Sequence, residues 1–525
     1  MDSFLITNNL GGYFWHSKTP ASRFQGWFMP FEGRMLKIVD SIEGDLRSIY
    51  FPKYYKSIII TAGAKSAISL TFDIRDSYAS APESGREYRM EERDGIIWVS
   101  YPLEKIVIGI KIHGGYKIID KWVEREYPLD AARHSSPSKL WVYEGIELVA
   151  RKACIAVGQS EREVQKELAR AMQFRIKKSP AFVKLKKDGH NSALASRLAK
   201  FSLLSLRVFN DKKKLIGLYG GLPWFFQFWP RDEAIAMTAF APLMYKEAKQ
   251  LASRRVLLFS GRKPFPAIIN LSGEHSELQS IDGSLWWMQK LKKLKVKDVP
   301  LELDAKFVMN GAKETWMDSI PREGARIEIQ ALKLALMRGA PVEKEFSEHV
   351  KKSFFNGELL ADGIEPDGQV DKTIRPNCFL AYYIYPDLLS SEEWETVFDL
   401  ALSHLWCAWG GFATLEKFHP EFCGAHTGQD AKSYHQGDSW FWINNLAAIA
   451  LNRVNSEKYR QYTQQILDAS ARDLLSCGIP GHASELSSAN EFAPSGSPVQ
   501  LWSSATFIEL FEELKLWNGK VIYSR

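Results

Sequence analysis

Four clusters in the C-terminal two-thirds of the sequence combine aromatic rings with side chains that can hold or move a proton. In chain order, the clusters run from Trp224 to Asp232, from Thr315 to Asp318, from Tyr434 to Trp440 and from Ser484 to Leu486. Flat rings can cover the apolar faces of a pyranose, while acids, amides and histidine can bind its hydroxyl groups. Two well-separated carboxylates in such surroundings suggest hydrolysis of a glycosidic bond.

Asp318 is the candidate general acid, and it follows Trp316 and Met317 directly. An acid that protonates a glycosidic oxygen needs a pKa near the working pH, and an apolar flank raises the pKa of a carboxyl by desolvation. Trp316 and Met317 provide that flank, and Trp316 is also predicted to contact the sugar. The structural alternative for Asp318 is an N-cap or turn aspartate. Glu328, between apolar neighbours on a predicted helix, is predicted to accept a hydrogen bond from a sugar hydroxyl.

The first cluster contains five rings within the six positions from Trp224 to Trp229, followed at once by Arg231 and Asp232. An arginine and an aspartate beside aromatic faces can hold two vicinal hydroxyls by charge-assisted hydrogen bonds. The alternative is an aromatic core segment that enters a helix, with Asp232 stabilised by the helix dipole. We therefore predict that Trp229, Arg231 and Asp232 bind substrate.

The third cluster places His435 and Gln436 before Gly437 and an aromatic helix start. A single histidine is ordinarily a satisfied core residue. Here the glycine and the following helix allow both side chains to point into a cleft, so His435, Gln436 and Trp440 are predicted to contact the ligand.

Glu485 is the candidate general base, a single acid in a loop of small residues. A solvated loop glutamate is the alternative interpretation, and Asp430 and Asp438 are rivals for the same role that spacing does not exclude. If Asp318 and Glu485 act on opposite faces of the sugar with inversion, their carboxyl groups should lie roughly 6.5 to 9.5 Å apart to admit a water molecule.

No cofactor and no metal is predicted. The sequence lacks H-E-x-x-H and C-x-x-C patterns, and the acidic stretch from Asp362 to Asp367 lacks the spacing of a calcium loop. It also lacks a Walker A pattern and the G-x-S-x-G of serine hydrolases.

The composition describes a globular chain of 525 residues, 45% hydrophobic and 25% charged, which suggests two to four domains. The net charge is +6, but the basic residues are spread out, as at Lys212 to Lys214 and Lys290 to Lys297. We interpret them as solvated faces, so no nucleic-acid partner is predicted. Five cysteines at wide spacing give neither a disulfide framework nor a zinc signature. Without a signal pattern or an apolar run of 18 residues, the sequence predicts a soluble cytoplasmic protein with no membrane contact; a homo-oligomer is compatible with it.

The elements that must position these clusters change in type along the chain. Period-two patterns at 66–74, 95–101, 106–112 and 145–150 predict antiparallel sheets packed as a sandwich over residues 1–158. An amphipathic pattern from 159 to 172 predicts a helical linker, assigned to residues 159–190. From Ser192 onward the periodic segments are helical, at 194–209, 232–251, 326–337, 392–405, 440–451 and 456–475.

Residues 191–525 are predicted to form a closed α/α barrel. Aromatic-rich loops join the helices and contain nearly all of the clusters, as expected if the loops converge on one mouth. A helical solenoid is disfavoured because no self-similarity appears at periods of 33 to 47 residues.

Taken together, these residues resemble the archaeal and bacterial glycogen debranching enzymes of the amylo-α-1,6-glucosidase type over nearly the whole chain. Near the N-terminus, Leu5 to Tyr13 and Arg23 to Gly26 are similar to two opening motifs of that family. Six further elements occur in the family's order, namely W-x-R-D at Trp229–Asp232, T-W-M-D at Thr315–Asp318, R-P-N at Arg375–Asn377, Y-H-Q-G at Tyr434–Gly437, S-E at Ser484–Glu485 and Q-x-W-S at Gln500–Ser503.

The resemblance implies an N-terminal β-sandwich, a C-terminal (α/α)6 barrel and hydrolysis of α-1,6-linked branch glucose with inversion. It implies Asp318 as general acid and Glu485 as general base, with glycogen, limit dextrin or a branched oligosaccharide as the α-glucan substrate. Asn9, Gln25, Cys378 and Asp438 depart from the family pattern, which bears on substrate range. The alternatives are a glucoamylase-like or trehalase-like α-glucosidase on the same scaffold, or a catalytically silent glycan-binding protein. The β domain is too short for the (β/α)8 unit of a transferase.

Overall fold

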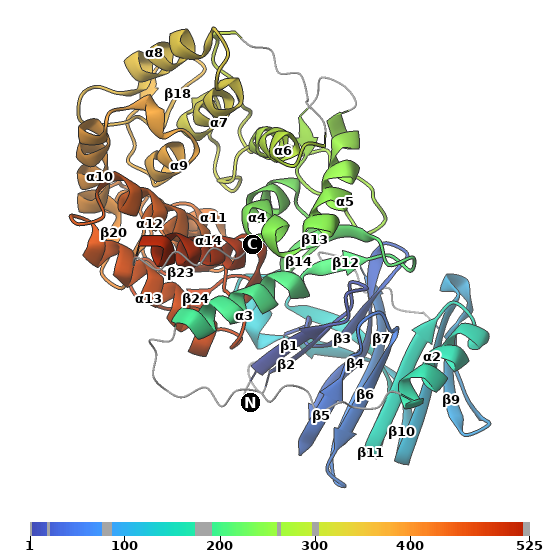
Figure 1. Cartoon of the computed structure of the whole chain (residues 1–525). Coiled ribbons are helices and arrows are strands. Elements are labelled where there is room, and N and C mark those ends of the chain that lie inside the picture. Colours follow the sequence, from blue (N-terminus) through green and yellow to red (C-terminus); the bar gives the residue numbers. More distant parts are fainter. Residues whose placement is uncertain are drawn as a thin grey trace. The chain divides into compact units, whose positions relative to one another are not determined.

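The computed structural model describes residues 3–17, 22–75, 87–173, 192–259, 264–296 and 304–517. The chain divides into two compact units (Figure 1). The first comprises Met1–Lys186 and Ser205–Lys214, and the second comprises Lys187–Leu204 and Leu215–Arg525.

The first unit is built on a large antiparallel sheet (Figure 1). Within the described residues its strand order is β1-β2-β3-β4-β7-β11-β10-β9-β8, and β6, which carries β5, also pairs with β11. The strands are β1 (Ser3–Thr7), β2 (Tyr13–Ser17), β3 (Gly26–Phe31), β4 (Arg34–Glu43), β5 (Leu46–Tyr50), β6 (Ser57–Ala62), β7 (Ala67–Arg75), β8 (Arg89–Arg93), β9 (Ile96–Tyr101), β10 (Ile106–Glu126) and β11 (Lys139–Gly158).

Strand β11 has two partners along one side. Its residues 144–149 pair with β7 and its residues 152–156 pair with β6. The sheet therefore branches at β11, and apolar side chains from both branches join one core. Ile68, Leu70 and Phe72 of β7 belong to that core and alternate with side chains of the other face, as the period-two pattern predicts.

The amphipathic segment after β11 is helix α2 (Glu161–Gln173), which confirms the helix predicted there. Its apolar stripe packs on the sheet, where Val164 and Leu168 join a cluster with Trp98 and Cys154. A side chain at Gly109 of β10 would overlap Val164, so the glycine permits this close approach. Residues 174–190 of the predicted linker lie outside the described residues.

Six helices of the second unit contact one another in a closed cycle (Figure 1). Each contacts the next in chain order, and the last contacts the first. They are α4 (Pro230–Leu243), α6 (Ile281–Lys293), α7 (Ile327–Met337), α9 (Asn377–Ile384), α12 (Phe441–Asn455) and α14 (Leu501–Trp517), and we call them the ring helices. In α12 every residue from 441 to 452 is buried, as expected for a helix with neighbours on all sides.

Other helices pack around this ring. Helices α5 (Tyr245–Arg255), α10 (Ser391–Leu405) and α13 (Arg460–Ser476) each contact two ring helices, and α8 (Glu343–Phe354) contacts α7. In α8 only Phe346, Val350 and Phe354 are buried, which is a single stripe with helical spacing. In α3 (Ser192–Ser205), Ser202 accepts a hydrogen bond from Ser504 of α14 at 2.9 Å.

A short strand leads directly into most ring helices. Strand β14 (Phe225–Phe228) precedes α4, β16 (Gln279–Ser280) precedes α6, β17 (Ala325–Arg326) precedes α7, β22 (Ser439–Trp440) precedes α12 and β25 (Val499–Gln500) precedes α14. These strands pair with neighbouring loops, for example β22 with β23 (Leu486–Ser487). The N-terminal ends of these five ring helices are therefore fixed by backbone hydrogen bonds.

The coarse prediction of an antiparallel sheet followed by helices is confirmed, but two of the segments predicted as helices are not single helices over the predicted range. The segment 232–251 forms two helices, because α4 ends just after Pro242, whose ring and missing N–H oppose continuation. The helix predicted from 194 to 209 ends at Ser205, and residues 207–209 form strand β12 (Arg207–Phe209).

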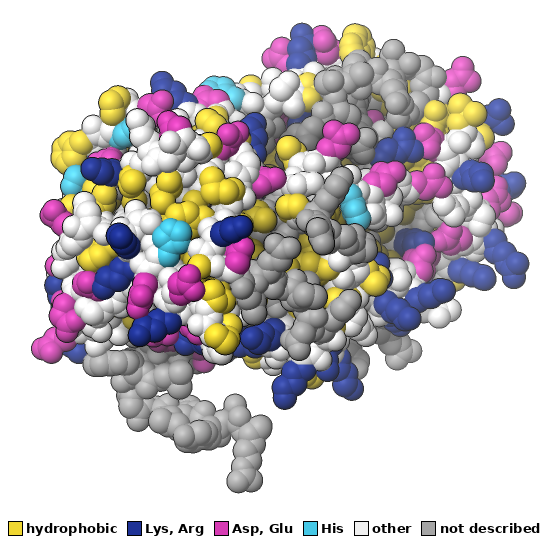
Figure 2. Space-filling view, turned by 90° about the horizontal axis from the view of Figure 1, so that it is seen from above, with side chains coloured by type: hydrophobic (Ala, Val, Ile, Leu, Met, Phe, Trp, Pro, Cys, Tyr) yellow, Lys and Arg dark blue, Asp and Glu magenta, His cyan; other side chains and the backbone are white. Residues whose placement is uncertain are grey.

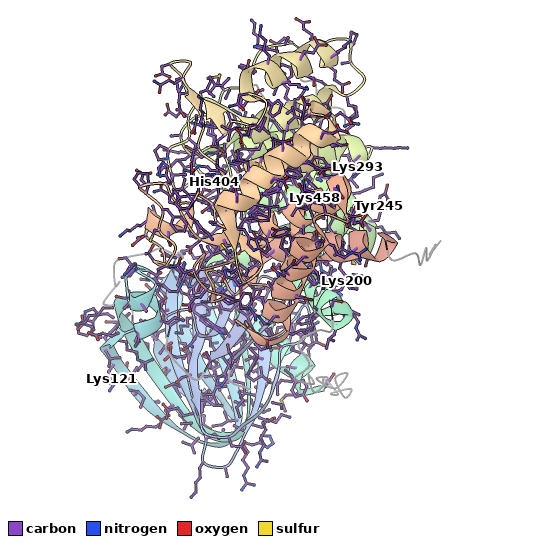
Figure 3. All side chains as sticks on the ribbon, turned by 90° about the vertical axis from the view of Figure 1, so that its left-hand side faces the viewer. Lys121, Lys200, Tyr245, Lys293, His404 and Lys458 are labelled. Atoms are coloured by element: carbon purple, nitrogen blue, oxygen red, sulfur yellow. The ribbon has the colours of Figure 1, made fainter. Side chains whose placement is uncertain are left out.

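A cavity of about 270 Å³ lies at the C-terminal ends of α4 and α6. Tyr245 and Lys293, which Figure 3 labels, belong to its lining, together with Met237, Thr238, Ala241, Pro242, Lys290 and Leu294. On the face that Figure 2 shows, basic and acidic side chains are intermixed. Among the described helices, none combines the length and apolar composition that crossing a membrane requires.

Candidate active site

The predicted site residues gather at the N-terminal ends of the ring helices. Asp232 lies in the first turn of α4 and Glu328 in the first turn of α7. Trp440 immediately precedes α12. The dipole of each helix places partial positive charge at this end, which favours carboxylates and other oxygen acceptors there. The cavity at the C-terminal ends of α4 and α6 is therefore not part of this site.

Arg231 joins the first cluster to the second. Its Nη1 lies 3.3 Å from Asp318 Oδ2 and donates to the Thr315 carbonyl at 3.2 Å, and its Nε donates to Asp232 Oδ2 at 3.3 Å. The guanidinium also lies 5.2 Å from the centre of the Trp502 ring. Asp318 differs from its neighbours in access, because its side chain is 31% exposed whereas that of Asp232 is 4% exposed. Asp318 is therefore the most accessible of these three side chains.

The carboxyl groups of Asp318 and Asp232 hold their protons more tightly than free acids do. Burial raises the pKa of Asp318, although the Arg231 guanidinium opposes that shift. Burial raises the pKa of Asp232 to about 7, and the charges of Asp318, Asp282 and Glu485 act in the same direction. Asp232 therefore lies within electrostatic reach of both Asp318 and Glu485.

Glu485 is buried, and both of its carboxylate oxygens accept hydrogen bonds. The Tyr434 hydroxyl donates to Oε1, and the Ser497 backbone N–H donates to Oε2 at 2.7 Å. The Glu485 backbone N–H in turn donates to the Ser497 carbonyl at 2.8 Å. Donors on both oxygens suit the ionised form, which a general base requires.

The tryptophans of the site pack on one another. Trp316 makes edge contacts with Trp440 and Trp442, and Trp442 stacks on Trp502 with ring centres 4.7 Å apart. Trp316 and Trp440 are both 2% exposed. Their indole N–H groups donate to Asn377 Oδ1 and to the Tyr434 carbonyl. They form a packed layer, whereas Trp229 is half-buried.

His435 lies within this layer and next to the acid. Its ring stacks on Trp440 with centres 4.9 Å apart, and its Nδ1 lies 2.6 Å from the hydroxyl of Ser319, the residue after Asp318. Burial and the charges of nearby arginines lower the pKa of His435 well below its usual value, so the ring is neutral. Gln436 beside it is half-buried.

Glu328 belongs to a buried ion-pair network rather than to an open surface. Arg322 donates to both Glu328 oxygens at 2.8 and 3.3 Å and to Asp362 Oδ2 at 2.8 Å. Arg322 also donates to Thr315 Oγ1, and Asp362 accepts from Asn377 at 2.7 Å. The network contacts the Asp318 segment through the Thr315 side chain, and the contact of Glu328 with a sugar stays a prediction.

The two rival bases have structural partners. Asp430 caps helix α11 (Ala431–Tyr434) by accepting from the Lys432 backbone N–H. Asp438 is buried and accepts from His426 and from the Ser433 hydroxyl, both at 2.8 Å. Glu485 is the candidate whose charge acts on Asp232.

Sequence reasoning missed Asp282, Arg322 and Asp362. Asp282 occupies the first turn of α6 and burial raises its pKa to about 6. The sequence contains a signal for Asp282, because Ser280 followed by Asp282 and Gly283 is typical of a helix N-terminus. Arg322 and Asp362 are 40 positions apart, and no local pattern pairs them. Among the described residues, no group of three or more His, Cys, Asp or Glu side chains is arranged to hold a metal ion.

Ionisation of Asp232 should cost stability as the pH rises. Burial raises its pKa to about 7, whereas an aspartate in an unfolded chain titrates near ~3.9. Between those values the folded state binds more protons than the unfolded chain, so the free energy of unfolding contributed by Asp232 falls with rising pH. The free energy of unfolding is measured by urea denaturation at about pH 5 and about pH 8. It should fall more between these two pH values in the wild type than in Asp232→Asn. Equal losses in the two proteins would contradict the buried titration.

Gly496 leaves room for Glu485, and this makes a matched pair of variants available. A Cβ at Gly496 would overlap the Glu485 carboxylate, whereas a Cβ at Gly368 meets nothing within 4 Å. Both glycines have positive φ, +68° and +88°, so alanine should cost each protein about 1 to 2 kcal/mol of stability. We expect Gly496→Ala to lower kcat and Gly368→Ala to leave it unchanged. The same kcat in both variants would argue against a role for the Glu485 carboxylate.

Comparison with known proteins finds a family match and similar folds. Residues 295–509 match the family model described as amylo-alpha-1,6-glucosidase. The fold is similar to the crystal structure of a bacterial glucoamylase complexed with acarbose, with a TM-score of 0.60 and 11% identity over 98% of this chain and 95% of that chain. A GH63 mannosylglycerate hydrolase from Thermus thermophilus, in complex with Tris and D-glycerate, has a TM-score of 0.45 and 10% identity over 61% of this chain and 99% of that chain. No curated protein matches the sequence.

These matches support the assignment of the chain to the glycoside hydrolases. More particularly, the segment 295–509 matches the amylo-alpha-1,6-glucosidase family, which confirms the resemblance for the sequence motifs that lie within this range.

Proposed function

We propose that the chain is an inverting α-glucosidase that releases α-1,6-linked glucose from branch points of glycogen or limit dextrin. Asp318 is the general acid, which protonates the leaving oxygen. Glu485 is the general base, which takes a proton from the attacking water. Trp229, Arg231 and Asp232 bind the sugar.

The contrast between the two carboxyl groups carries this proposal. Asp318 is 31% exposed, and burial nevertheless raises its pKa, as a proton donor requires. Glu485 is buried, and the Tyr434 hydroxyl and the Ser497 N–H donate to its two oxygens. One carboxyl group lies in surroundings that favour its protonated form and the other in surroundings that favour its ionised form. This contrast is typical of an acid and base pair. The charges of Asp318 and Glu485 both raise the pKa of Asp232, which supports placing the two carboxyl groups around one substrate.

The scaffold is part of the same proposal. We take the ring helices and the helices packed outside them as an (α/α)6 barrel, which the closed cycle of contacts supports. The branching sheet of the first unit is taken as a β-sandwich, supported by the apolar core that both branches share. Five free cysteines support a cytoplasmic location.

A glucoamylase-type activity on α-1,4 linkages is the second candidate, because the fold is similar to that of a bacterial glucoamylase. The two candidates differ in the linkage they cleave, so one assay separates them. Glucose release is measured in parallel from an isomaltose-type, a maltose-type and a trehalose substrate, and from a limit dextrin. We expect the isomaltose-type substrate and the dextrin to be cleaved fastest. Faster cleavage of the maltose-type substrate would transfer the assignment to the second candidate, and no release from any substrate would leave a glycan-binding protein.

A further inference from the structure

A second buried carboxylate lies directly behind the loop that carries Glu485. Asp473, on helix α13 outside the ring, is 1% exposed. Its Oδ2 accepts from the backbone N–H of Ser484 at 2.7 Å, and its Oδ1 accepts from the Ser484 hydroxyl at 2.8 Å. Ser484, the residue that precedes Glu485, thus donates to both oxygens of the Asp473 carboxylate.

Two physical costs oppose a carboxylate at this position. The first is desolvation, since burial raises the pKa of Asp473 to about 7 and the groups that oppose the shift are the two donors of Ser484. The second is the helix dipole, because Asp473 lies in the last turn of α13, where partial negative charge disfavours an acid. Because both effects destabilise the Asp473 carboxylate, we expect it to have a compensating role. Its hydrogen bonds with Ser484 indicate that role.

The loop after Ser484 is fixed on its other sides by backbone hydrogen bonds. The Glu485 N–H donates to the Ser497 carbonyl at 2.8 Å, and the Phe441 N–H donates to the Glu485 carbonyl at 3.3 Å. These bonds fix the loop relative to α12 and to the segment before α14. Asp473 supplies a further anchor, on the side of α13.

We infer that Asp473 is a positioning residue for the general base, which acts through Ser484 to hold the Glu485 carboxylate in line with the attacking water. The inference rests on the proposed function of Glu485. In the proposed mechanism, Asp473 contacts neither the substrate nor the attacking water. A base displaced by about 1 Å can lose about 100-fold in rate, so an anchor outside the ring can have a large effect.

The test compares two variants of the full chain on helix α13. Asp473→Ala removes both bonds to Ser484. Ser470→Ala is the matched control, because Ser470 is also buried and its hydroxyl donates to Asn445 of α12 at 2.9 Å rather than to Ser484. We expect Asp473→Ala to lower kcat by about 10- to 100-fold with little change in KM, and Ser470→Ala to keep the wild-type kcat. Equal kcat in the two variants, at a temperature where both are folded by circular dichroism, would overturn the inference.

A second substrate separates a defect at the base from a defect at the acid. In α-glucosyl fluoride the leaving fluoride needs no protonation, so its hydrolysis depends on the base and not on the acid. Asp473→Ala should lose activity on the fluoride as well, whereas Asp318→Asn should retain most of it. If Asp473→Ala keeps its activity on the fluoride, the residue does not position the base.

The outcomes also distinguish this inference from the proposed function. If Glu485→Gln hydrolyses the fluoride at the wild-type rate, the proposed base is wrong, whatever Asp473→Ala does. If Glu485→Gln is inactive and Asp473→Ala matches Ser470→Ala, only the inference fails. Should Asp473→Ala not fold, Ser484→Ala serves instead, because its backbone N–H can still donate to Asp473 Oδ2 whereas the hydroxyl bond to Oδ1 is removed. A loss of about 3- to 10-fold in kcat is then expected, since one of the two anchoring bonds is lost, and an unchanged kcat overturns the inference.

Discussion

Asp318→Asn should lower kcat on an α-1,6-linked glucoside by about 10²- to 10⁴-fold and leave KM nearly unchanged. The amide has the size of the acid but no proton to give to the leaving oxygen. Arg231 keeps its ion pair with Asp232 and its bond to the Thr315 carbonyl, so the site should stay assembled. Steady-state kinetics, with folding checked by thermal unfolding, measures the effect.

Two comparisons sharpen this prediction. Asp387→Asn removes an exposed acid that pairs with Arg338, and it should change nothing. α-Glucosyl fluoride should remain a good substrate of Asp318→Asn, because fluoride leaves without protonation. In the wild type, activity should fall as the pH rises through the pKa of Asp318, which burial raises, because the acid must be protonated to act. Near-full activity of Asp318→Asn on the glucoside would refute the acid assignment.

Glu485→Gln is expected to lower kcat by a similar factor, about 10²- to 10⁴-fold, and on the fluoride as well. The amide fits the site if its NH2 group faces the Tyr434 hydroxyl, which can rotate to accept, while its oxygen keeps the bond from the Ser497 N–H. The variant should therefore fold but lack a group that can take a proton from water. Kinetics on both substrates measures the loss.

The rival acids supply the controls for the base. Asp430→Asn alters a helix cap, and Asp438→Asn alters a contact with His426. Any loss of activity in these variants should therefore match their loss of stability. Azide offers a positive test, since in Glu485→Ala it can enter in place of water and attack the β face without a base. Formation of β-glucosyl azide is then expected. An active Glu485→Gln beside an inactive Asp438→Asn would transfer the role to Asp438.

The parts of the fold that could be predicted from sequence have one buried face. The alternation in β7 and the stripe of α2 each leave a periodic pattern, because one side packs on the core and the other meets solvent. The ring helices α9 and α14 escaped prediction for the converse reason. In α9 all residues from 377 to 382 are buried, so no polar face marks a helical period.

The same limit applies to the candidate site. Asp318 and Glu485 could be proposed from residue type and flanking residues, since the chemistry of an acid or a base is local to its side chain. The pairing of Arg322 with Glu328 and Asp362, and of Asp473 with Ser484, depends on the tertiary fold and leaves no trace in spacing. Burial of Trp316 and Trp440 depends on it too, which is why their place in a packed layer was not foreseen.

The anomeric form of the first product tests the central claim most directly. Proton NMR follows the hydrolysis of a branched oligosaccharide that carries a single α-1,6-linked glucose, from the first minutes and before mutarotation. Attack of water from the face opposite the leaving oxygen, with Asp318 as acid and Glu485 as base, predicts that β-glucose appears first and α-glucose only later. Initial release of α-glucose, or no release of glucose, would contradict the account.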